Sequence, residues 1–161
     1  MARNTSPTAE SFEQCILGCA LEDPSFSLPI LRREGIGPRH FEDMRLGGLL
    51  SIIAEMHKRG TPMDDVLLSK ALQSANIALD LSFLNSLRTC IPSAANLEYY
   101  LPDIKSAFQR RYLKTLANQA LKIADDATLD IAVINDTIEQ FSTFARGMDG
   151  DNLPEIVDVA H

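Results

Sequence analysis

The chain has 161 residues, of which 45% are hydrophobic and 23% charged, and this balance excludes a disordered chain, a collagen-like repeat and a coiled-coil rod. No run of about 18 apolar residues is present and no apolar stretch follows Arg3, so we expect neither a membrane span nor a secretory signal. Three cysteines cannot all pair, which favours reduced thiols in a cytoplasmic protein.

A first helix is predicted to begin at Ser11, because Ser11 and Gln14 have the S-x-x-Q form of a capping box. Apolar residues then recur at spacings of three and four, which is typical of one buried helical face. We expect Pro24, Pro29 and Pro38 to divide the stretch that follows into short pieces.

Three further helices are predicted before residue 92. A leucine-rich helix ends near Gly60, which is placed for a left-handed C-cap. Asp64 or Asp65 is expected to cap the next helix, and Asp80 the one after it. The spacing therefore predicts an all-α fold that begins with a compact bundle of six short helices over residues 11–92.

Residues 93–146 have the pattern of two long amphipathic helices joined by an acidic turn at Asp125-Asp126, which predicts a helical hairpin. Each helix has more apolar positions than one facing helix needs, so we expect a partner, either the bundle or a second hairpin. Pro102 predicts a kink, or a helix that restarts with this proline in its first turn. The candidate dimerisation surface consists of Leu113, Leu116, Ala120, Ile123, Ile134, Ile138 and Phe141.

The two ends of the chain have different patterns. Residues 1–10 are expected to be flexible, and residues 147–152 to form a flexible linker. Pro154 then suits the first turn of another helix, which continues to His161. A helix this short is marginal alone, so we expect it to be cut off or to need a partner.

The formal net charge of −7 is concentrated at the C-terminal end, where residues 125–161 hold nine acidic side chains and one basic one. A locally basic stretch precedes it. Arg110, Arg111 and Lys114 in that stretch are candidates for contact with nucleic acid, although a solvated helix face is the simpler interpretation.

No pattern of residues marks a catalytic site. The chain has no G-x-x-x-x-G-K-[ST] loop, no C-x-x-C and no H-E-x-x-H. Cys15 and Cys19 could form a zinc site with His40 and His57, but core packing explains two cysteines on an apolar helix face more simply. No motif marks Cys90 as a nucleophile. These residues favour a helical interaction module over an enzyme.

Several short blocks follow one another along the chain in a specific order. They are Glu13-Gln14-x-Ile16-Leu17-Gly18, Phe41, Gly60-Thr61-Pro62-Met63-Asp64, Pro92-Ser93-Ala94-Ala95-Asn96, Tyr99-Tyr100 and Arg110-Arg111. Taken together, these blocks resemble the N-terminal domain of DnaB-type replicative DNA helicases. The first block and the Pro92 block are the specific ones, and the resemblance spans roughly residues 11–161.

The resemblance implies a six-helix bundle, a helical hairpin and the start of a linker helix. In that family, hairpins pair between subunits, and six such domains form a collar built as a trimer of dimers. The collar binds the helicase-binding domain of primase and can contact a helicase loader, while DNA is held mainly by the full-length protein.

The resemblance also implies where the chemistry lies. ATP hydrolysis, with ATP and Mg²⁺, belongs to a RecA-like C-terminal domain, so we expect no cofactor, no metal and no catalytic residue in this chain. On this interpretation the chain is a fragment of an ATP-dependent helicase. The alternatives are a natural stand-alone helical adaptor and a weak single-stranded nucleic-acid-binding module.

Overall fold

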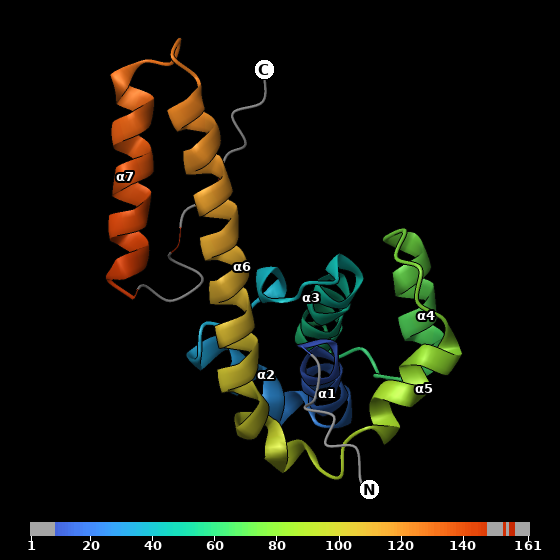
Figure 1. Ribbon diagram of the computed structural model, residues 1–161. Coiled ribbons are helices and arrows are strands. Elements are labelled where there is room, and N and C mark those ends of the chain that lie inside the picture. Colours follow the sequence, from blue (N-terminus) through green and yellow to red (C-terminus); the bar gives the residue numbers. More distant parts are fainter. Residues whose placement is uncertain (1–8, 148–152, 154, 157–161) are drawn as a thin grey trace, which may run out of the picture. The chain divides into compact units, whose positions relative to one another are not determined.

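The computed structural model describes residues 9–147, 153, 155 and 156, with side chains from residue 12 onward, and its regular elements in this part are all helical (Figure 1). The predicted all-α fold is confirmed. The chain divides into two compact units, residues 1–106 and residues 107–161. None of the helices in the described part is long and apolar enough to cross a membrane.

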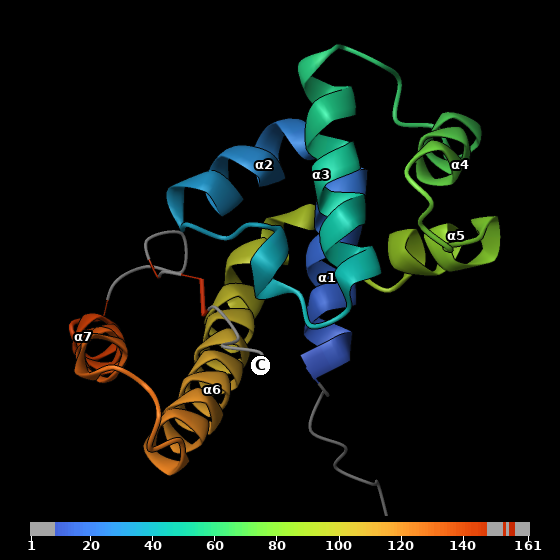
Figure 2. The same cartoon turned by 90° about the horizontal axis from the view of Figure 1, so that it is seen from above.

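The first unit contains five complete α-helices and the start of a sixth. The complete ones are α1 (Ala9–Glu22), α2 (Pro24–Arg33), α3 (Met44–Lys58), α4 (Asp65–Ser74) and α5 (Leu81–Thr89), with 3-10 turns η1 (Pro38–His40) and η2 (Ala94–Asn96). Helix α1 packs against α2, α3 and α5, while α4 packs against α3 and α5 (Figure 2). The bundle therefore reaches six helices only with the beginning of α6 (Leu97–Asp125).

Helices α2 to α5 each begin at an aspartate whose side chain accepts a hydrogen bond from a backbone N–H of the first turn. This satisfies one of the N–H groups that a helix start leaves without a partner. The prediction for the caps of α4 and α5 is confirmed. The four caps are Asp23 (3.0 Å), Asp43 (2.9 Å), Asp64 (2.9 Å) and Asp80 (2.8 Å).

Two positions of the first unit require glycine for structural reasons. Gly60 follows α3 with a φ of +67°, so the predicted left-handed C-cap is confirmed. Gly18 lies where α1 crosses α5, and a Cβ atom there would collide with the carbonyl oxygen of Leu87. Glycine therefore allows the two helix backbones to approach each other closely.

Two predicted helix boundaries are wrong. Helix α1 begins at Ala9 rather than Ser11, because Ala9 and Glu10 are good helix formers and extend it towards the N-terminus. Pro29 lies inside α2 and does not break it. Burial of Leu28 and Leu31 on the same helix offsets the one backbone hydrogen bond that this proline removes.

The start of α6 belongs to the core of the bundle. Leu97, Leu101 and Ile104 are buried with the apolar residues of α1 to α5. The division between the units therefore falls after Ser106, later than the predicted boundary after residue 92. Helix α6 also runs through Pro102 without a restart, although this proline occupies its second turn and removes one backbone hydrogen bond there.

Two charged side chains of α2 and its C-cap hold the start of α6 in place. Arg33 donates to Glu98 at 2.7 Å, and Lys105 donates to Glu34 at 3.0 Å. The Lys105 ammonium group and, secondarily, Arg33 hold the pKa of the Glu34 carboxyl below its usual value. Both pairs are exposed to solvent, which screens them, so each contributes little to stability.

Little of the predicted C-terminal helix can be compared with the structure. Leu153, Glu155 and Ile156 are described, and none of them is helical. The rest of that predicted helix, the linker over 148–152 and residues 1–8 of the predicted flexible N-terminus lie outside the described residues.

Candidate interaction surface on the hairpin

The second unit is a hairpin formed by α6 from residue 107 onward and α7 (Ile131–Ala145). The connection between the helices is short and closed by local bonds. Asp126 accepts hydrogen bonds from the backbone N–H of Thr128 at 2.9 Å and from its hydroxyl at 2.6 Å. Asp130 then caps α7 by accepting from Ala132 at 3.4 Å. The predicted acidic turn is thus confirmed.

Aromatic side chains form the small core of this hairpin. Phe108, Tyr112 and Leu116 of α6 are buried against Phe144 of α7, together with Leu153. The rings of Tyr112 and Phe144 are stacked, with centroids 5.5 Å apart and planes 14° apart. Large rings suit this position because they bridge two helices that meet over a narrow contact.

Four of the seven residues predicted for dimerisation lie wholly or partly within the unit itself. Leu116 and Ile123 are buried, while Ala120 and Phe141 are half-buried. Phe141 also packs against the aromatic core. These side chains stabilise the hairpin and offer little surface to a partner.

The other three predicted residues are exposed, and two further aliphatic residues accompany them. Half of the ten exposed large hydrophobic side chains of the described chain lie in this unit, which marks it as the richest apolar surface. Their exposed fractions are 44% for Leu113, 62% for Leu121, 70% for Ile131, 40% for Ile134 and 58% for Ile138. We call these five residues the hairpin face.

Helical geometry brings the two halves of the hairpin face together. On α6, Leu113 lies roughly 100° and Leu121 roughly 180° around the axis from the buried side chains. On α7, Ile131, Ile134 and Ile138 lie roughly 50–110° from the buried side chains, in the same rotational sense along the chain. Helices α6 and α7 run in opposite directions (Figure 1). Rotations in the same sense on antiparallel helices lead to the same side, so Leu113 and the three isoleucines share one side of the hairpin, while Leu121 lies further around α6. Leu121 and Ile131 were not predicted because they fall outside the core spacing.

The three basic residues predicted to contact nucleic acid do not form one cluster. Arg110 and Lys114 are exposed and lie one turn apart on α6, so they share a face. Arg111 is half-buried and lies on a different side of the helix. The phosphates of a nucleic-acid backbone could therefore contact Arg110 and Lys114 together.

The cysteines are grouped differently from the arrangement considered for zinc. Cys90, at the end of α5, lies near Cys15 and Cys19 of α1, and its thiol donates to the carbonyl of Leu87 at 3.1 Å. Burial raises the pKa of the Cys19 thiol to about 12 and that of Cys90 to about 11. Both thiols therefore stay protonated at neutral pH and are poor nucleophiles.

The histidines considered as zinc ligands have other surroundings. His40 is buried, and its Nδ1 atom accepts from the backbone N–H of Gly37 at 3.1 Å. His57 is exposed near the end of α3. Within the part of the chain that the structure describes, no three or more His, Cys, Asp or Glu side chains are placed to hold a metal ion.

Comparison with known proteins decides the family. Residues 5–106 match the family profile described as DnaB-like helicase N terminal domain. The chain belongs to this family. It is 27% identical over 123 residues to the replicative DNA helicase DnaB of Geobacillus stearothermophilus, an alignment that covers 74% of this chain and 26% of that helicase. It is also 27% identical over 117 residues to the replicative DNA helicase DnaC of Bacillus subtilis (strain 168), which covers 71% of this chain and 25% of that helicase.

The matched residues can be compared with the two units of the structure. The DnaB-like profile ends at residue 106, where the first unit also ends. The profile therefore covers the bundle, while the two helicase alignments cover 74% and 71% of the chain and so extend beyond residue 106. The aligned part amounts to about a quarter of the length of each helicase.

Proposed function

We propose that this DnaB-like domain joins the subunits of a replicative DNA helicase by pairing its hairpin with the hairpin of a second copy. The hairpin face carries the proposal. Five large exposed aliphatic side chains on a small unit, four of them on one side, exceed the scattered apolar residues that a surface normally shows.

A second copy is the natural occupant of such a face. Two identical surfaces related by a twofold axis bury the same stripe on both chains. Covering a large aliphatic side chain contributes about 1.5–3 kcal/mol when burial is complete. Partial covering of ten such side chains, five from each chain, would contribute a driving force that opposes the entropic cost of association.

The proposal extends to the assembly of the whole protein. Three such dimers would form the collar of a hexameric helicase, and the paired hairpins would provide a composite surface for the helicase-binding domain of primase or for a helicase loader. Because the chain spans about a quarter of its relatives, ATP-dependent unwinding is proposed for the full-length protein and not for this domain.

Light scattering over a concentration series tests the pairing. The wild-type chain, of 17.8 kDa, is expected to reach twice this mass as the concentration rises. Ile134→Asp combined with Ile138→Asp should keep the mass of a monomer, because a charge on each side chain cannot be buried between copies. Met44→Asp is the matched control, since it also replaces an exposed apolar side chain but lies on α3.

Two outcomes would contradict the pairing. An unchanged mass of the double variant would show that the hairpin face is not the interface. Loss of helical circular dichroism in that variant would show that Ile134 and Ile138 belong to the core of the hairpin. Phe141 is unsuitable for this test because it already packs against the aromatic core.

Binding of single-stranded DNA is the second candidate function, and the exposed pair Arg110 and Lys114 favours it. The anisotropy of a labelled oligo-dT at low salt measures it directly. Binding should weaken as salt increases and should fall further when both residues are changed to Glu. If the anisotropy of the oligo-dT does not rise when the wild-type chain is added at low salt, this candidate function is excluded.

A further inference from the structure

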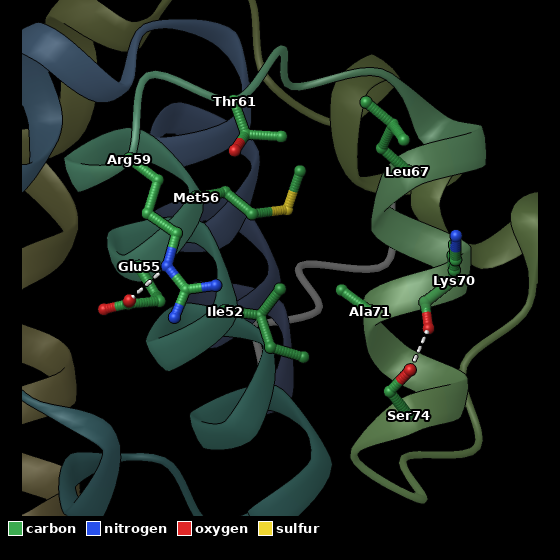
Figure 3. Close-up of a pocket in the computed structure, with 9 residues that line it drawn as sticks. All are labelled: Ile52, Glu55, Met56, Arg59, Thr61, Leu67, Lys70, Ala71 and Ser74. Carbon is green, nitrogen blue, oxygen red and sulfur yellow. Dashed lines mark hydrogen bonds and ion pairs between the residues drawn. The ribbon is translucent and has the colours of Figure 1, made fainter.

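The bundle contains an open groove between α3 and α4 that none of the functions above uses (Figure 3). Its volume is about 460 Å³, which lies within the range of about 300–1,000 Å³ that is typical of binding pockets. The floor is apolar. Ile52 and Met56 of α3 face Leu67 and Ala71 of α4 across it.

The rim of the groove is basic, although the chain as a whole is acidic. Arg59 donates from Nε to Glu55 at 2.6 Å, and Figure 3 shows its guanidinium group on the α3 side of the groove. Lys70 lies on α4, and no described carboxylate forms an ion pair with it. Two cations and one carboxylate leave a net positive rim in a chain whose formal charge is −7.

The wall formed by α4 is held in place before anything binds. Arg88 of α5 donates from Nη2 to the carbonyl of Met63 at 2.6 Å and from Nε to Asp65 at 3.0 Å. Its Nη1 atom also donates to the carbonyl of Leu21 at 3.2 Å. One side chain thus fixes the start of α4 relative to α1 and α5, which lowers the entropic cost of binding in the groove.

The shape of the groove suits a helix. Its lining residues span about two helical turns on each wall, from Ile52 to Arg59 and from Leu67 to Ser74. An amphipathic helix presents apolar side chains at matching intervals.

We propose that this groove binds an acidic amphipathic helix of a partner protein. Aliphatic side chains at positions i, i+3 and i+7 of that helix would enter the floor. Carboxylates beside them would pair with Lys70 and with the free side of the Arg59 guanidinium group. Charge complementarity selects an acidic partner over a basic one. The proposal is independent of hairpin pairing, because it concerns residues of the bundle alone.

A synthetic peptide pair tests the proposal. The first peptide is an amphipathic helix with Leu at i, i+3 and i+7 and Glu at the flanking positions, and the second has Lys in place of each Glu. Two-dimensional NMR of the labelled chain should show saturable shifts for the acidic peptide, centred on Ile52, Met56, Leu67 and Ala71. The basic peptide should cause no saturable shift at these residues.

Two variants check the place of binding. Lys70→Glu should lower the affinity for the acidic peptide about fivefold, because an electrostatic attraction at the rim becomes a repulsion. Lys58→Glu is the matched control, since it changes the net charge equally but does not line the groove, and it should leave the affinity unchanged. Ala71→Trp should remove saturable binding by filling the floor, while thermal melting verifies that the bundle still folds.

Three results would overturn the proposal. The first is the absence of saturable shifts with the acidic peptide, and the second is equal binding of the acidic and basic peptides. The third is a change in the NMR signals of the groove residues when the chain is diluted without peptide. Such a change would mean that a second copy of the chain occupies the groove.

Discussion

The bundle and the hairpin differ in how much of their apolar surface they cover themselves. The bundle buries a cluster of 23 residues drawn from α1 to α5, the segments between the helices and the start of α6. The buried cluster of the hairpin has four residues, and five large aliphatic side chains on its outside remain exposed. Two amphipathic helices have one contact between them, whereas six can enclose a core. The bundle therefore encloses most of its apolar side chains by itself, whereas the hairpin leaves a larger share of its own exposed.

Truncation of a leucine in each unit should give the largest contrast. Leu84→Ala in the bundle should lower the free energy of unfolding by about 2–5 kcal/mol, because this side chain is fully buried. Leu121→Ala in the hairpin should change it by about 0.5 kcal/mol or less in dilute solution. Urea denaturation at low protein concentration measures both, and a large loss for Leu121→Ala would mean that the hairpin face is covered within the single chain.

Removal of a helix cap in each unit should give a smaller contrast. Asp80→Ala should destabilise the bundle by about 1 kcal/mol, because its hydrogen bond to Phe83 is short at 2.8 Å. Asp130→Ala should cost less, since the corresponding bond to Ala132 is long at 3.4 Å. Equal losses in urea denaturation would show that the length of the cap bond does not matter here.

The pH dependence of Glu34 should give the smallest effect. Lys105 and Arg33 lower the pKa of this carboxyl, so its contribution to stability is present above the ordinary pKa of about 4 and is lost as pH falls through the lower, folded value. Wild type should thus be slightly more stable than Glu34→Gln at neutral pH and equal to it in acid. A difference in stability between wild type and Glu34→Gln that persists in acid would show that packing, and not charge, causes the effect.

The sequence predicted most of the helices because their starts are encoded locally. Asp64, Asp80 and Gly60 act within a few residues of themselves, so their roles could be read from the chain. Boundaries that depend on distant contacts were missed. Only the packed bundle shows that the start of α6 belongs to its core and that Pro29 is tolerated inside α2.

The candidate site was predicted less completely than the fold. Apolar spacing indicated that the hairpin has an excess of aliphatic residues, but it could not separate Leu116, which is buried, from Leu113, which is exposed. That distinction depends on which side of α6 faces α7 and the Leu153 segment. The groove between α3 and α4 left no signal in the sequence, since its walls come from helices whose placement depends on Arg88.

Aspartate caps at α2, α3, α4, α5 and α7 have a consequence for how the chain acquires its structure during synthesis. Each cap bonds to an N–H two or three residues further on, so it needs no contact with a distant part of the chain. The ribosome delivers residues in order at about 5–20 per second, which is far slower than a helical turn forms. Each helix start is thus specified as soon as its first turn has emerged, and the later search is confined to the packing of helices whose boundaries already exist.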